Sequence, residues 1–545
     1  MRLKDYQQKA PTIPSPKGIE INSGFERALQ MMNDPNTNVF VTGRAGTGKS
    51  TLLEHWRDTT KKKAAVLAPT GVAALNVKGQ TIHSFFGFGP SITPGAVKKL
   101  PENNKKKALY KKLDAIVIDE ISMVRADLLD CIDKFLRLNG RSRNYPFGGV
   151  KMIFIGDLYQ LPPVVTSDQK KAFEKLYETP YFFSAEVFGR RQGQFKDMGE
   201  PFVFELIELE KIYRQSDADF IRILNGVRTN TAEDEDFALL NTRYDSEFEP
   251  KSDDFWIHLT TTNHTASAVN ERRLANLKGA SKNFRAQVYG KVDSKSYPTD
   301  ERLSVKAGAQ VMMVNNDRAG RWVNGSVGRV TGFDEDEDTG RPVVTVEFPF
   351  GVTEAVEPHT WDVYEWRYAP GIGVVAEPVG SFSQYPFRLA WAVTIHKSQG
   401  KTFDRAIVDV ERGTFAPGQM YVALSRCRTL EGLVLKQKIS KRHILRDWRV
   451  VKFLTEFQYR ESEAKRSLPD KIALIKQAIA NKQKLRITYL KAKDEKSRRL
   501  ITPRRVEEME YMGKTYMGID AYCHERQDDR IFRVDRILEL NLVEE

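Results

Sequence analysis

The sequence of 545 residues contains only three cysteines, Cys131, Cys427 and Cys523. They are too few and too widely spaced for a disulfide framework or a structural zinc site. The chain also lacks any run of about eighteen apolar residues, which argues against a membrane span. Its first residues carry charges and prolines but no apolar segment, so they do not have the pattern of a secretion signal. We therefore expect an intracellular, cytoplasmic protein in a reducing compartment.

Acidic residues are fewer than basic residues in this chain. The 85 Lys and Arg residues outnumber the 72 Asp and Glu residues, which leaves a net charge of +13. Such a balance favours phosphate polymers, whose counterions are released on binding. A solvated Lys-rich surface gives the same composition, so charge alone does not identify a partner. The length suggests roughly three or four domains.

Alternating strands and helices are expected in the first part of the chain. Short apolar segments, each a candidate strand, occupy residues 38–42, 64–68, 115–119 and 152–157. Apolar strands that alternate with helices indicate a parallel sheet covered on both faces. A second α/β region is expected to start near Phe204 and to resume near Trp391, with strands at 256–260 and 405–410. Between its halves, short segments at 309–314, 328–333 and 343–348 predict a small all-β insertion.

A glycine-rich loop lies between the first predicted strand and a predicted helix. Gly43-Arg44-Ala45-Gly46-Thr47-Gly48-Lys49-Ser50 matches G-x-x-x-x-G-K-[ST]. In this context backbone N–H groups curl around the β-phosphate of a nucleotide, Lys49 reaches the β- and γ-phosphate oxygens, and Ser50 can ligate Mg²⁺. The alternative is a glycine-rich turn with an idle lysine. We predict a nucleotide site that comprises Gly43, Gly46, Thr47, Gly48, Lys49, Ser50 and Thr51.

Polar residues follow two further predicted strands. Asp119 is placed to hold Mg²⁺, directly or through water, and Glu120 to polarise the attacking water as a general base. A surface acidic pair is the alternative, but the P-loop two strands earlier favours the catalytic interpretation. Gln160, after the next strand, can touch the γ-phosphate and sense its loss. The alternative there is a Pro-rich loop that only shapes the fold.

Two arginines are candidates for coupling. In a chain with 85 Lys and Arg residues, a single arginine is ordinarily solvated surface. Arg214 and Arg426, however, are expected in the second α/β region. A motor needs positive charge delivered from a second lobe to the γ-phosphate, so that hydrolysis changes the spacing of the lobes.

Six sequence motifs occur in a fixed order: residues 68–76 (APTGVAALN), 79–86 (GQTIHSFF), 118–124 (IDEISMV), 154–164 (FIGDLYQLPPV), 394–400 (TIHKSQG) and 421–426 (YVALSR). The set resembles superfamily 1 helicases, and within them the PIF family (petite integration frequency). Residues 128–149, which end in PFGG, look like the segment that separates this family from RecD-like relatives. The resemblance covers about residues 23–455.

The end of the chain has a resemblance of its own. Residues 485–490 (LRITYL), 502–506 (TPRRV) and 530–537 (RIFRVDRI) are similar to a WYL domain. Such domains are compact, strongly bent β-sheet modules that bind nucleic acid or a small ligand and often regulate an attached domain. One amphipathic helix is expected before them, at about residues 471–482.

Together the resemblances imply an α/β fold with two RecA-like P-loop lobes, a small SH3-like β-barrel insertion and a C-terminal WYL domain. ATP and Mg²⁺ are expected between the lobes. The expected boundaries are a flexible lead-in at 1–20, a first lobe at 21–188 with a basic wedge insertion at about 88–112, a second lobe at 189–302 and 378–460, the β insertion at 303–377, a charged linker at 461–470 and the WYL domain at 471–545.

The family resemblance also implies DNA contacts. Hydroxyls and lysine suit phosphates, and aromatic rings suit base stacking. The residues concerned are Thr70, His83, Phe85, His396, Lys397 and Ser398, and Gly400 of the same motif is assigned to the nucleotide site. The alternative places His83 and Phe85 in the core and makes Thr70 a turn former.

In the tail, an arginine-rich face is a candidate for phosphate binding. Its members are Arg486, Arg504, Arg505, Arg533 and Arg536. Paired surface charge is the alternative, because Glu507, Glu508, Asp528 and Asp529 lie nearby in the sequence.

One position departs from the family pattern. Relatives often place a glutamine ahead of the P-loop to read adenine, and the corresponding place here holds Phe25. Phosphate binding is thus better supported by the sequence than the choice of adenine.

We conclude from the sequence that the chain is an ATP-dependent DNA helicase that translocates 5′→3′ on single-stranded DNA and unwinds duplex, with the WYL domain tuning DNA binding or coupling. A ligand-responsive DNA-binding ATPase switch without processive unwinding is the alternative. The expected partners are single-stranded DNA and forked duplex DNA, with no membrane. The expected form is a monomer, associated with the nucleoid if the source is bacterial.

Overall fold

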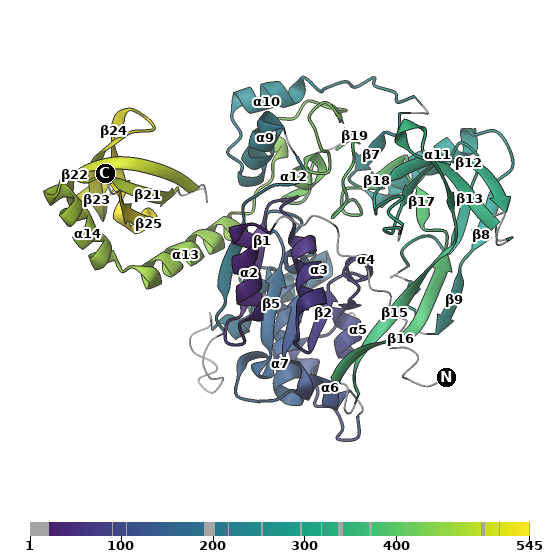
Figure 1. The fold of residues 1–545 in the computed structure, drawn as a ribbon, viewed down its shortest axis with the longest axis horizontal. Helices are drawn as coiled ribbons and strands as arrows, with labels where there is room; N and C mark the ends of the chain where they lie inside the picture. The colour runs from purple at the N-terminus through teal and green to yellow at the C-terminus, as the bar shows by residue number, and fades with distance from the viewer. Residues whose placement is uncertain are drawn as a thin grey trace. The chain divides into compact units, whose positions relative to one another are not determined.

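The computed structural model (Figure 1) describes residues 21–89, 91–104, 106–189, 202–215, 217–251, 254–290, 292–294, 297–317, 319–335, 340, 342–369, 373–410, 413–491, 496–511 and 513–543. The predicted lead-in at 1–20 lies outside them. The chain divides into two compact units, one reaching to Leu224 and continuing over Asp234–Leu445, the other formed by Asn225–Glu233 and Arg446–Glu545. Within the described ranges, no helix is long and apolar enough to span a membrane.

The first unit begins with a six-stranded parallel sheet in the order β3-β2-β4-β5-β1-β6. Its strands are buried because apolar side chains project to both faces, which helices cover. The strands are β1 (Val39–Gly43), β2 (Ala64–Ala68), β3 (Gln80–Thr81), β4 (Ala115–Ile118), β5 (Lys151–Ile155) and β6 (Glu205–Leu209). The helices are α2 (Ser23–Asn33), α3 (Lys49–Thr59), α4 (Gly71–Asn76), α5 (Ile82–Phe86), α6 (Lys107–Lys112), α7 (Ala126–Asn139) and α8 (Ser167–Leu176). The parallel sheet predicted from the sequence is confirmed.

Strand β6 corrects one sequence-based boundary. We expected a second α/β region to start near Phe204, but β6 pairs in parallel with β1, with Val39 opposite Glu205 and Gly43 opposite Leu209. It is therefore the edge strand of the first sheet. Its alternating burial, with Ile207 and Leu209 inside, is typical of an edge strand that is covered less completely than the central ones.

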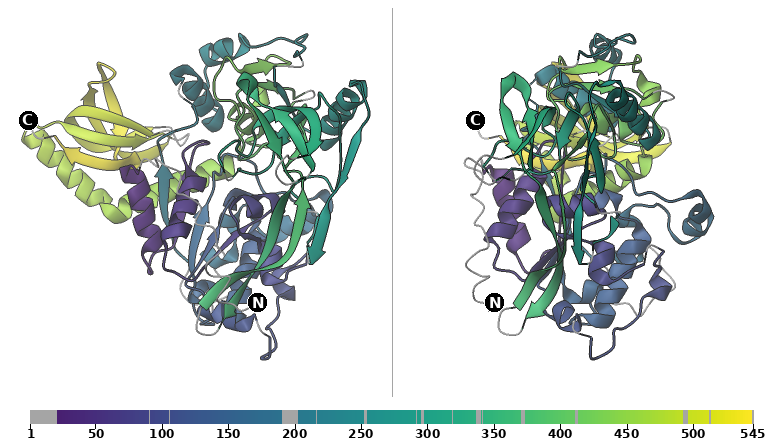
Figure 2. Two further views of the ribbon diagram at one scale, coloured as in Figure 1. Left: turned by 45° about the vertical axis from the view of Figure 1, so that its right-hand side comes forward. Right: turned by 90° about the vertical axis from the view of Figure 1, so that its right-hand side faces the viewer.

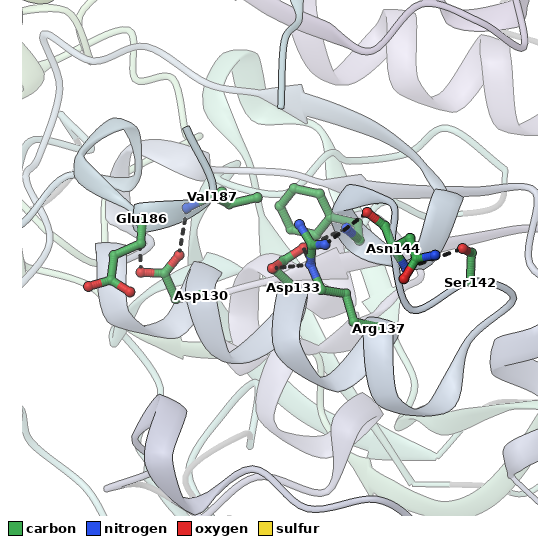
Figure 3. Close-up of polar contacts among 8 residues, drawn as sticks. Asp130, Asp133, Arg137, Ser142, Asn144, Glu186 and Val187 are labelled. Atoms are coloured by element: carbon green, nitrogen blue, oxygen red, sulfur yellow. Dashed lines mark hydrogen bonds and ion pairs between the residues drawn. The ribbon is translucent and has the colours of Figure 1, made fainter. Parts of the chain in front are cut away.

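Helix α7 carries a buried carboxylate that organises a distant loop. Asp130 accepts hydrogen bonds from the backbone N–H groups of Glu186 (2.9 Å) and Val187 (3.2 Å) and from the Tyr177 hydroxyl (2.9 Å). Figure 3 shows the side chain pointing from the helix toward that loop. Burial raises the pKa of Asp130 to about 7, although its three donors oppose the shift. The polar contacts thus anchor residues 177–187 to the helix.

A second carboxylate on α7 explains the PFGG segment. Asp133 accepts from the backbone N–H of Phe147 (2.6 Å) and pairs with Arg137 (2.8 Å), as Figure 3 shows. The Phe147 bond holds a turn in which that residue has φ +50° and Gly148 has φ +65°. A Cβ at Gly148 would lie 2.5 Å from the Leu136 carbonyl oxygen, so the turn requires glycine there.

The second sheet of this unit has four parallel strands in the order β18-β7-β19-β20. They are β7 (Ile257–Thr260), β18 (Ala392–Thr394), β19 (Ala406–Val408) and β20 (Leu433–Leu435). The helices of this part of the chain are α9 (Ala218–Thr229), whose last residues fall in the second unit, α10 (Asp234–Asn241), α11 (Asn263–Asn276) and α12 (Gln419–Leu424). The predicted strands at 256–260 and 405–410 correspond to β7 and β19.

Between β7 and β18 the chain forms an antiparallel β region with its own core. Its main sheet has the order β14-β13-β12-β11-β17, and smaller sheets pair β10 with β8 and place β16 between β15 and β9. The strands are β8 (Lys282–Arg285), β9 (Gln287–Gly290), β10 (Arg302–Val305), β11 (Gln310–Met313), β12 (Val327–Glu335), β13 (Pro342–Glu347), β14 (Thr353–Val356), β15 (His359–Ala369), β16 (Gly373–Gln384) and β17 (Phe387–Leu389).

The β region extends beyond the predicted limits of 303–377. Strands β8 and β9 precede the expected start, and β16 and β17 pass the expected end. These segments are short or paired with distant strands, so local sequence patterns do not identify them. Figures 1 and 2 show the β15–β16 hairpin running beside the first sheet's domain, where it contacts α6.

The second unit is a five-stranded antiparallel sheet with two helices. The sheet order is β24-β23-β22-β21-β25, and its core includes Ile475 of α14. The elements are α13 (Trp448–Lys465), α14 (Leu468–Ala480), β21 (Leu485–Leu490), β22 (Lys496–Tyr511), β23 (Lys514–Cys523), β24 (Asp528–Arg533) and β25 (Ile537–Leu542). The β22–β23 register shifts between Pro503 and Arg505, where proline has no N–H to donate and the strand bulges.

The predicted charged linker at 461–470 is wrong. Its residues form the last turns of α13 and the first turn of α14, which Ser467 caps by accepting from the Asp470 N–H. Ser462 is buried and donates to the Leu538 carbonyl (2.8 Å), and the Lys471 ammonium donates to the Ser462 hydroxyl (2.8 Å). Polar residues that were predicted to form a solvated linker are therefore packed against β25 and held there by hydrogen bonds.

Candidate active site

The P-loop follows β1 directly and ends in the first turn of α3. Gly48 precedes that helix with φ +85°. Gly43 and Gly46 are needed for close approach: a Cβ on Gly43 would lie 2.8 Å from the Leu209 carbonyl oxygen, and one on Gly46 would lie 2.5 Å from the Arg214 Cβ. The loop is thus bounded by β6 and by the segment that follows it, and it leads into the N-terminus of α3, where a phosphate is expected.

Lys49 lies inside the curl of the loop. Its ammonium donates to the carbonyl oxygens of Gly43 (2.7 Å) and Arg44 (3.0 Å). The side chain therefore already lies where phosphate oxygens are expected. Ser50, at the second position of α3, is exposed, as a ligand for Mg²⁺ must be.

The acidic pair follows β4. Asp119 is 8% exposed, and burial together with the neighbouring Glu120 charge raises its pKa to about 7. Burial also raises the pKa of Glu120, whose backbone has φ +50°. Lys49 and Arg426 already supply positive charge near this buried pair, and a divalent cation held by Asp119, Ser50 and phosphate oxygens would further favour its charged form. The residues thus fit Mg²⁺.

The described residues contain no cluster of three or more His, Cys, Asp and Glu side chains that could hold a metal.

A glutamine pair links the catalytic carboxylate to the loop after β5. The Gln160 amide donates to the Asp157 carboxylate (3.4 Å). The Gln399 amide donates to Glu120 Oε2 (3.1 Å) and to Gln160 Oε1 (3.4 Å). Gln399 follows β18 of the second sheet, so both lobes contribute to this corner of the site. Sequence reasoning missed Gln399, although it lies inside the His396–Gly400 motif.

The two arginines converge, but not as predicted. Arg214 follows β6 and so belongs to the first lobe, which corrects its assignment to the second. Its guanidinium donates to the Ser425 carbonyl (3.2 Å). Arg426, 1% exposed, donates to the carbonyls of Val422 (2.9 Å) and Lys401 (3.1 Å). Burial and the Arg214 charge lower the pKa of Arg426. Contact of either side chain with a γ-phosphate stays a prediction.

Two further contacts join the lobes at the nucleotide site. The Tyr421 hydroxyl of α12 accepts a hydrogen bond from the P-loop N–H of Ala45 (2.8 Å). A Cβ on Gly418, just before α12, would lie 2.4 Å from the Tyr159 carbonyl oxygen and 2.5 Å from that of Gln160. Tyr421 was quoted in a motif but given no role. The site is therefore a seam between two sheets.

Helix α2 and Tyr213 lie beside the P-loop at Gly48, where the sequence predicts a nucleotide. Phe25 is 2% exposed and packs in the core, with Cε2 3.5 Å from the Cβ position of Gly48, so it does not face a base. Asn22 caps α2 and donates to the Tyr213 hydroxyl (2.9 Å). The Tyr213 ring is 44% exposed and also lies beside Gly48. The sequence alone predicts no role for Tyr213.

The residues of the first lobe that were predicted to contact DNA differ in their exposure to solvent. Thr70 caps α4 by accepting from the Ala73 N–H (3.2 Å) and remains exposed. His83 is partly buried, and burial lowers its pKa. Phe85 is 2% exposed and packs edge-on against Tyr110. A base cannot reach the Phe85 ring in this structure, so the alternative interpretation of Phe85 as a core residue is correct.

The candidates after β18 also differ from one another. Ser398 is fully buried and its hydroxyl donates to the Ile395 carbonyl (2.8 Å), which closes the turn, and a contact of this hydroxyl with a phosphate stays a prediction. Lys397 and Gly400 are exposed. The His396 ring is nearly parallel to the Phe415 ring, at 13° and 6.2 Å between centroids. Phe415 is 63% exposed and was missed because it lies outside the quoted motifs.

Most arginines of the tail are paired. Arg504 contacts Asp529 (2.8 Å), Arg505 contacts Glu507 (3.2 Å), and Arg533 contacts Asp535 (2.6 Å). Arg486 and Arg536 have no ion pair of this kind among the residues that the structure describes. The alternative of paired surface charge therefore holds for part of the face, and phosphate binding there stays a prediction.

The sheet of the second unit also bears a cleft of about 700 Å³. Two aromatic side chains, several cations and three carboxylates line it: Tyr489, Phe532, Lys491, Arg499, Arg526, Arg530, Asp520, Asp528 and Asp529. Its mixed charge does not define a single class of ligand.

A P-loop after a parallel strand, a carboxylate pair after a neighbouring strand and a second sheet that contacts both are the features of a two-lobed, RecA-like P-loop nucleoside triphosphatase. A family model described as PIF1-like helicase matches residues 22–182, and a WYL domain model matches residues 470–542.

The chain is 36% identical to human ATP-dependent DNA helicase PIF1, over 73% of this chain and 58% of the human protein. It is 32% identical to ATP-dependent DNA helicase Pif1 of Bdellovibrio bacteriovorus, over 81% and 93% of the two chains. The crystal structure of Bacteroides sp Pif1 with ADP-AlF4 matches with a TM-score of 0.72 at 36% identity, covering 81% of this chain and 98% of that chain. The chain therefore belongs to the PIF1-like helicase family.

Proposed function

We propose that this chain is an ATP-dependent DNA helicase that translocates 5′→3′ on single-stranded DNA and unwinds duplex. The observation that carries the proposal is the contact of second-lobe side chains with the hydrolytic groups of the first lobe: Gln399 with Glu120, and Tyr421 with the P-loop. A site shared in this way changes its lobe contacts when the nucleotide changes, which is what a motor requires.

The position of each residue in the site indicates the role that we propose for it in ATP hydrolysis. The P-loop N–H groups and Lys49 bind the β- and γ-phosphates. Ser50 and Asp119 hold Mg²⁺, which when bound neutralises charge that develops on the phosphates. Glu120 takes the proton of the attacking water. Gln160 orients the γ-phosphate, and Arg214 and Arg426 stabilise charge at the seam. The exposed Tyr213 ring offers a surface on which a base can stack.

The DNA track is proposed along the exposed side chains Thr70 and Lys397 and the partly buried His83 and His396, with Phe415 as an added stacking surface. In support of the DNA substrates, the Pif1 helicase of Bacteroides has been solved with ADP-AlF3 and single-stranded DNA, and two coordinating Pif1 helicases have been described at forked duplex DNA. We propose the same two substrates here, a monomer as the acting form, and the cytoplasm or nucleoid as its location.

The β region and the basic segment at about 88–112 are proposed to act on the duplex. The five-stranded antiparallel sheet with its separate core supports an SH3-like barrel. The basic segment ends in α6, against which the β15–β16 hairpin lies. That arrangement suits a wedge that meets the fork.

Strand polarity tests the proposal. The chain, with ATP and Mg²⁺, is expected to unwind a partial duplex that has a 5′ single-stranded tail, and to unwind the matched 3′-tailed duplex at least about tenfold more slowly. Lys49→Ala should abolish unwinding, because the phosphates lose their cation. Strand separation is followed by loss of fluorescence quenching between labelled strands. Preference for the 3′ tail, or unwinding by Lys49→Ala, would refute the mechanism.

For the WYL domain we propose a contribution to single-strand affinity through Arg486, which is exposed on β21. Arg486→Glu should weaken binding of an oligothymidylate severalfold at low salt and reduce the salt slope by about one, as expected for a phosphate contact. Lys476→Glu, the same charge change on the exposed face of α14, is the control. Equal effects of the two variants on binding measured by fluorescence anisotropy would exclude a specific contact.

A ligand-responsive switch without unwinding is not favoured. Such a switch has no need for the second-lobe residues that reach the hydrolytic groups, and this chain retains them.

A further inference from the structure

Gln399 connects two parts of the molecule that the sequence motifs describe separately. Its backbone lies in the turn after β18, next to His396 and Lys397, and its side chain reaches Glu120 in the other lobe. We propose that Gln399 is a positioning residue through which DNA bound at the His396–Lys397 segment sets the orientation of Glu120. The inference rests on the proposed function and specifies how DNA stimulates hydrolysis.

The turn that carries Gln399 is internally bonded. The Ser398 N–H donates to the Thr394 carbonyl (3.0 Å), and the Gln399 N–H donates to the His396 carbonyl (3.2 Å). The buried Ser398 hydroxyl adds a bond to the Ile395 carbonyl. These bonds make residues 394–399 one stiff unit, so a shift of His396 or Lys397 on binding DNA moves the backbone of Gln399 as well.

The outer side of the same turn is accessible. Lys397 is exposed, and the His396 ring lies nearly parallel to the exposed Phe415 ring. A phosphate and a base thus have partners within three residues of Gln399. The inner side faces the carboxylate, so one turn presents both a DNA-facing and a nucleotide-facing surface.

The side-chain amide of Gln399 has the chemistry needed to orient the Glu120 carboxylate. One NH₂ group has two hydrogens, and here they meet two acceptors of the first lobe, Glu120 Oε2 at 3.1 Å and Gln160 Oε1 at 3.4 Å. A neutral donor orients the carboxylate without neutralising it, whereas a lysine would hold it as an ion pair and a glutamate would repel it. The same amide therefore orients the proposed base and the proposed γ-phosphate sensor together.

A contact that serves only to pack the lobes would behave differently on removal. It would lower hydrolysis to the same extent with and without DNA, because the geometry of the site would be lost in both states. A contact that transmits the state of the DNA segment instead contributes a coupling free energy, and its removal lowers the ratio of the two rates.

The test compares steady-state ATP hydrolysis with and without a saturating oligothymidylate. Gln399→Leu keeps the size of the side chain but has no donor, and Gln399→Glu keeps its shape but repels Glu120. We expect the ratio of kcat with DNA to kcat without DNA to fall about tenfold in both variants, within the 5–150-fold range of such couplings. The KM for ATP and the affinity for the oligothymidylate should change less than threefold, because neither ligand is bound by this amide.

Gln477→Leu, the same substitution at an exposed position of α14, is the control and should keep the wild-type ratio. Thermal unfolding of each variant identifies any that fails to fold, and the second variant then supplies the answer. An unchanged ratio, or an equal loss in both states, overturns the inference while the wild-type chain remains a DNA-stimulated ATPase. Absence of DNA stimulation or of unwinding in the wild-type chain instead overturns the proposed function itself.

Discussion

Glu120→Gln is expected to lower the rate of ATP hydrolysis by about 10³-fold while ATP still binds, because an amide has the same shape but cannot take a proton from water. The Gln399 amide donates to Glu120 Oε2 at 3.1 Å, and the amide oxygen of the variant can accept the same bond, so the lobe contact is retained. The phosphate contacts of the P-loop and Lys49 do not involve this side chain. Single-turnover hydrolysis and equilibrium binding of a fluorescent nucleotide separate the two effects.

Glu174→Gln is a matched control, since the Glu174 side chain is 62% exposed on α8 and lies 3.9 Å from the Lys170 ammonium. It should hydrolyse ATP at the wild-type rate. Hydrolysis by Glu120→Gln within tenfold of the wild-type chain would show that another group takes the proton. A parallel loss of nucleotide binding would show that Glu120 holds the nucleotide or its metal rather than the water.

Arg426→Lys is expected to lower hydrolysis by about 10³-fold, at the lower end of the range for arginines that stabilise phosphoryl transfer. Arg426 uses its fork of donors on several acceptors at once: the carbonyls of Val422 and Lys401 and the Ser425 hydroxyl. Lysine keeps the charge but presents a single point, so it cannot satisfy these groups and also face a phosphate. A loss of hydrolysis in Arg426→Lys would therefore show that the geometry of the guanidinium matters, because the charge is unchanged.

Arg428→Lys is the control for this substitution. Arg428 lies two residues further along, its side chain is 58% exposed, and it pairs with Asp404. We expect wild-type hydrolysis and an unchanged melting temperature from it, whereas Arg426→Lys should also melt earlier because buried carbonyls lose donors. If Arg426→Lys melts earlier but hydrolyses normally, Arg426 supports the fold alone and Arg214 becomes the candidate at the γ-phosphate.

The strands of the first sheet and the P-loop were predictable because their signals are local. An apolar run of four or five residues between helices, followed by glycines at fixed spacing, specifies a backbone path within ten residues. Strand β6 and the linker were mispredicted for the opposite reason. The partner of β6 is β1, more than 160 residues earlier, and the polar residues near Ser462 are satisfied by carbonyls of β25.

The DNA candidates show the limit of motif-based reasoning. His396, Lys397 and Ser398 are adjacent in one motif, yet the structure exposes Lys397 and buries Ser398 completely. Phe85 has the residue type for base stacking but packs against Tyr110. Burial depends on neighbours supplied by other segments, so residue type and spacing alone do not distinguish a ligand contact from a core contact.

By itself the sequence located the groups proposed for the nucleotide site, since the positions of Lys49, Ser50, Asp119 and Glu120 are set by their own strand ends. It also determined the family and the presence of a separate tail domain. Only the tertiary structure decided how the lobes meet. Glu120 and Gln399 are 279 residues apart, and Ala45 and Tyr421 are 376 apart. Such contacts depend on the packing of two sheets, which no contiguous pattern of residues encodes.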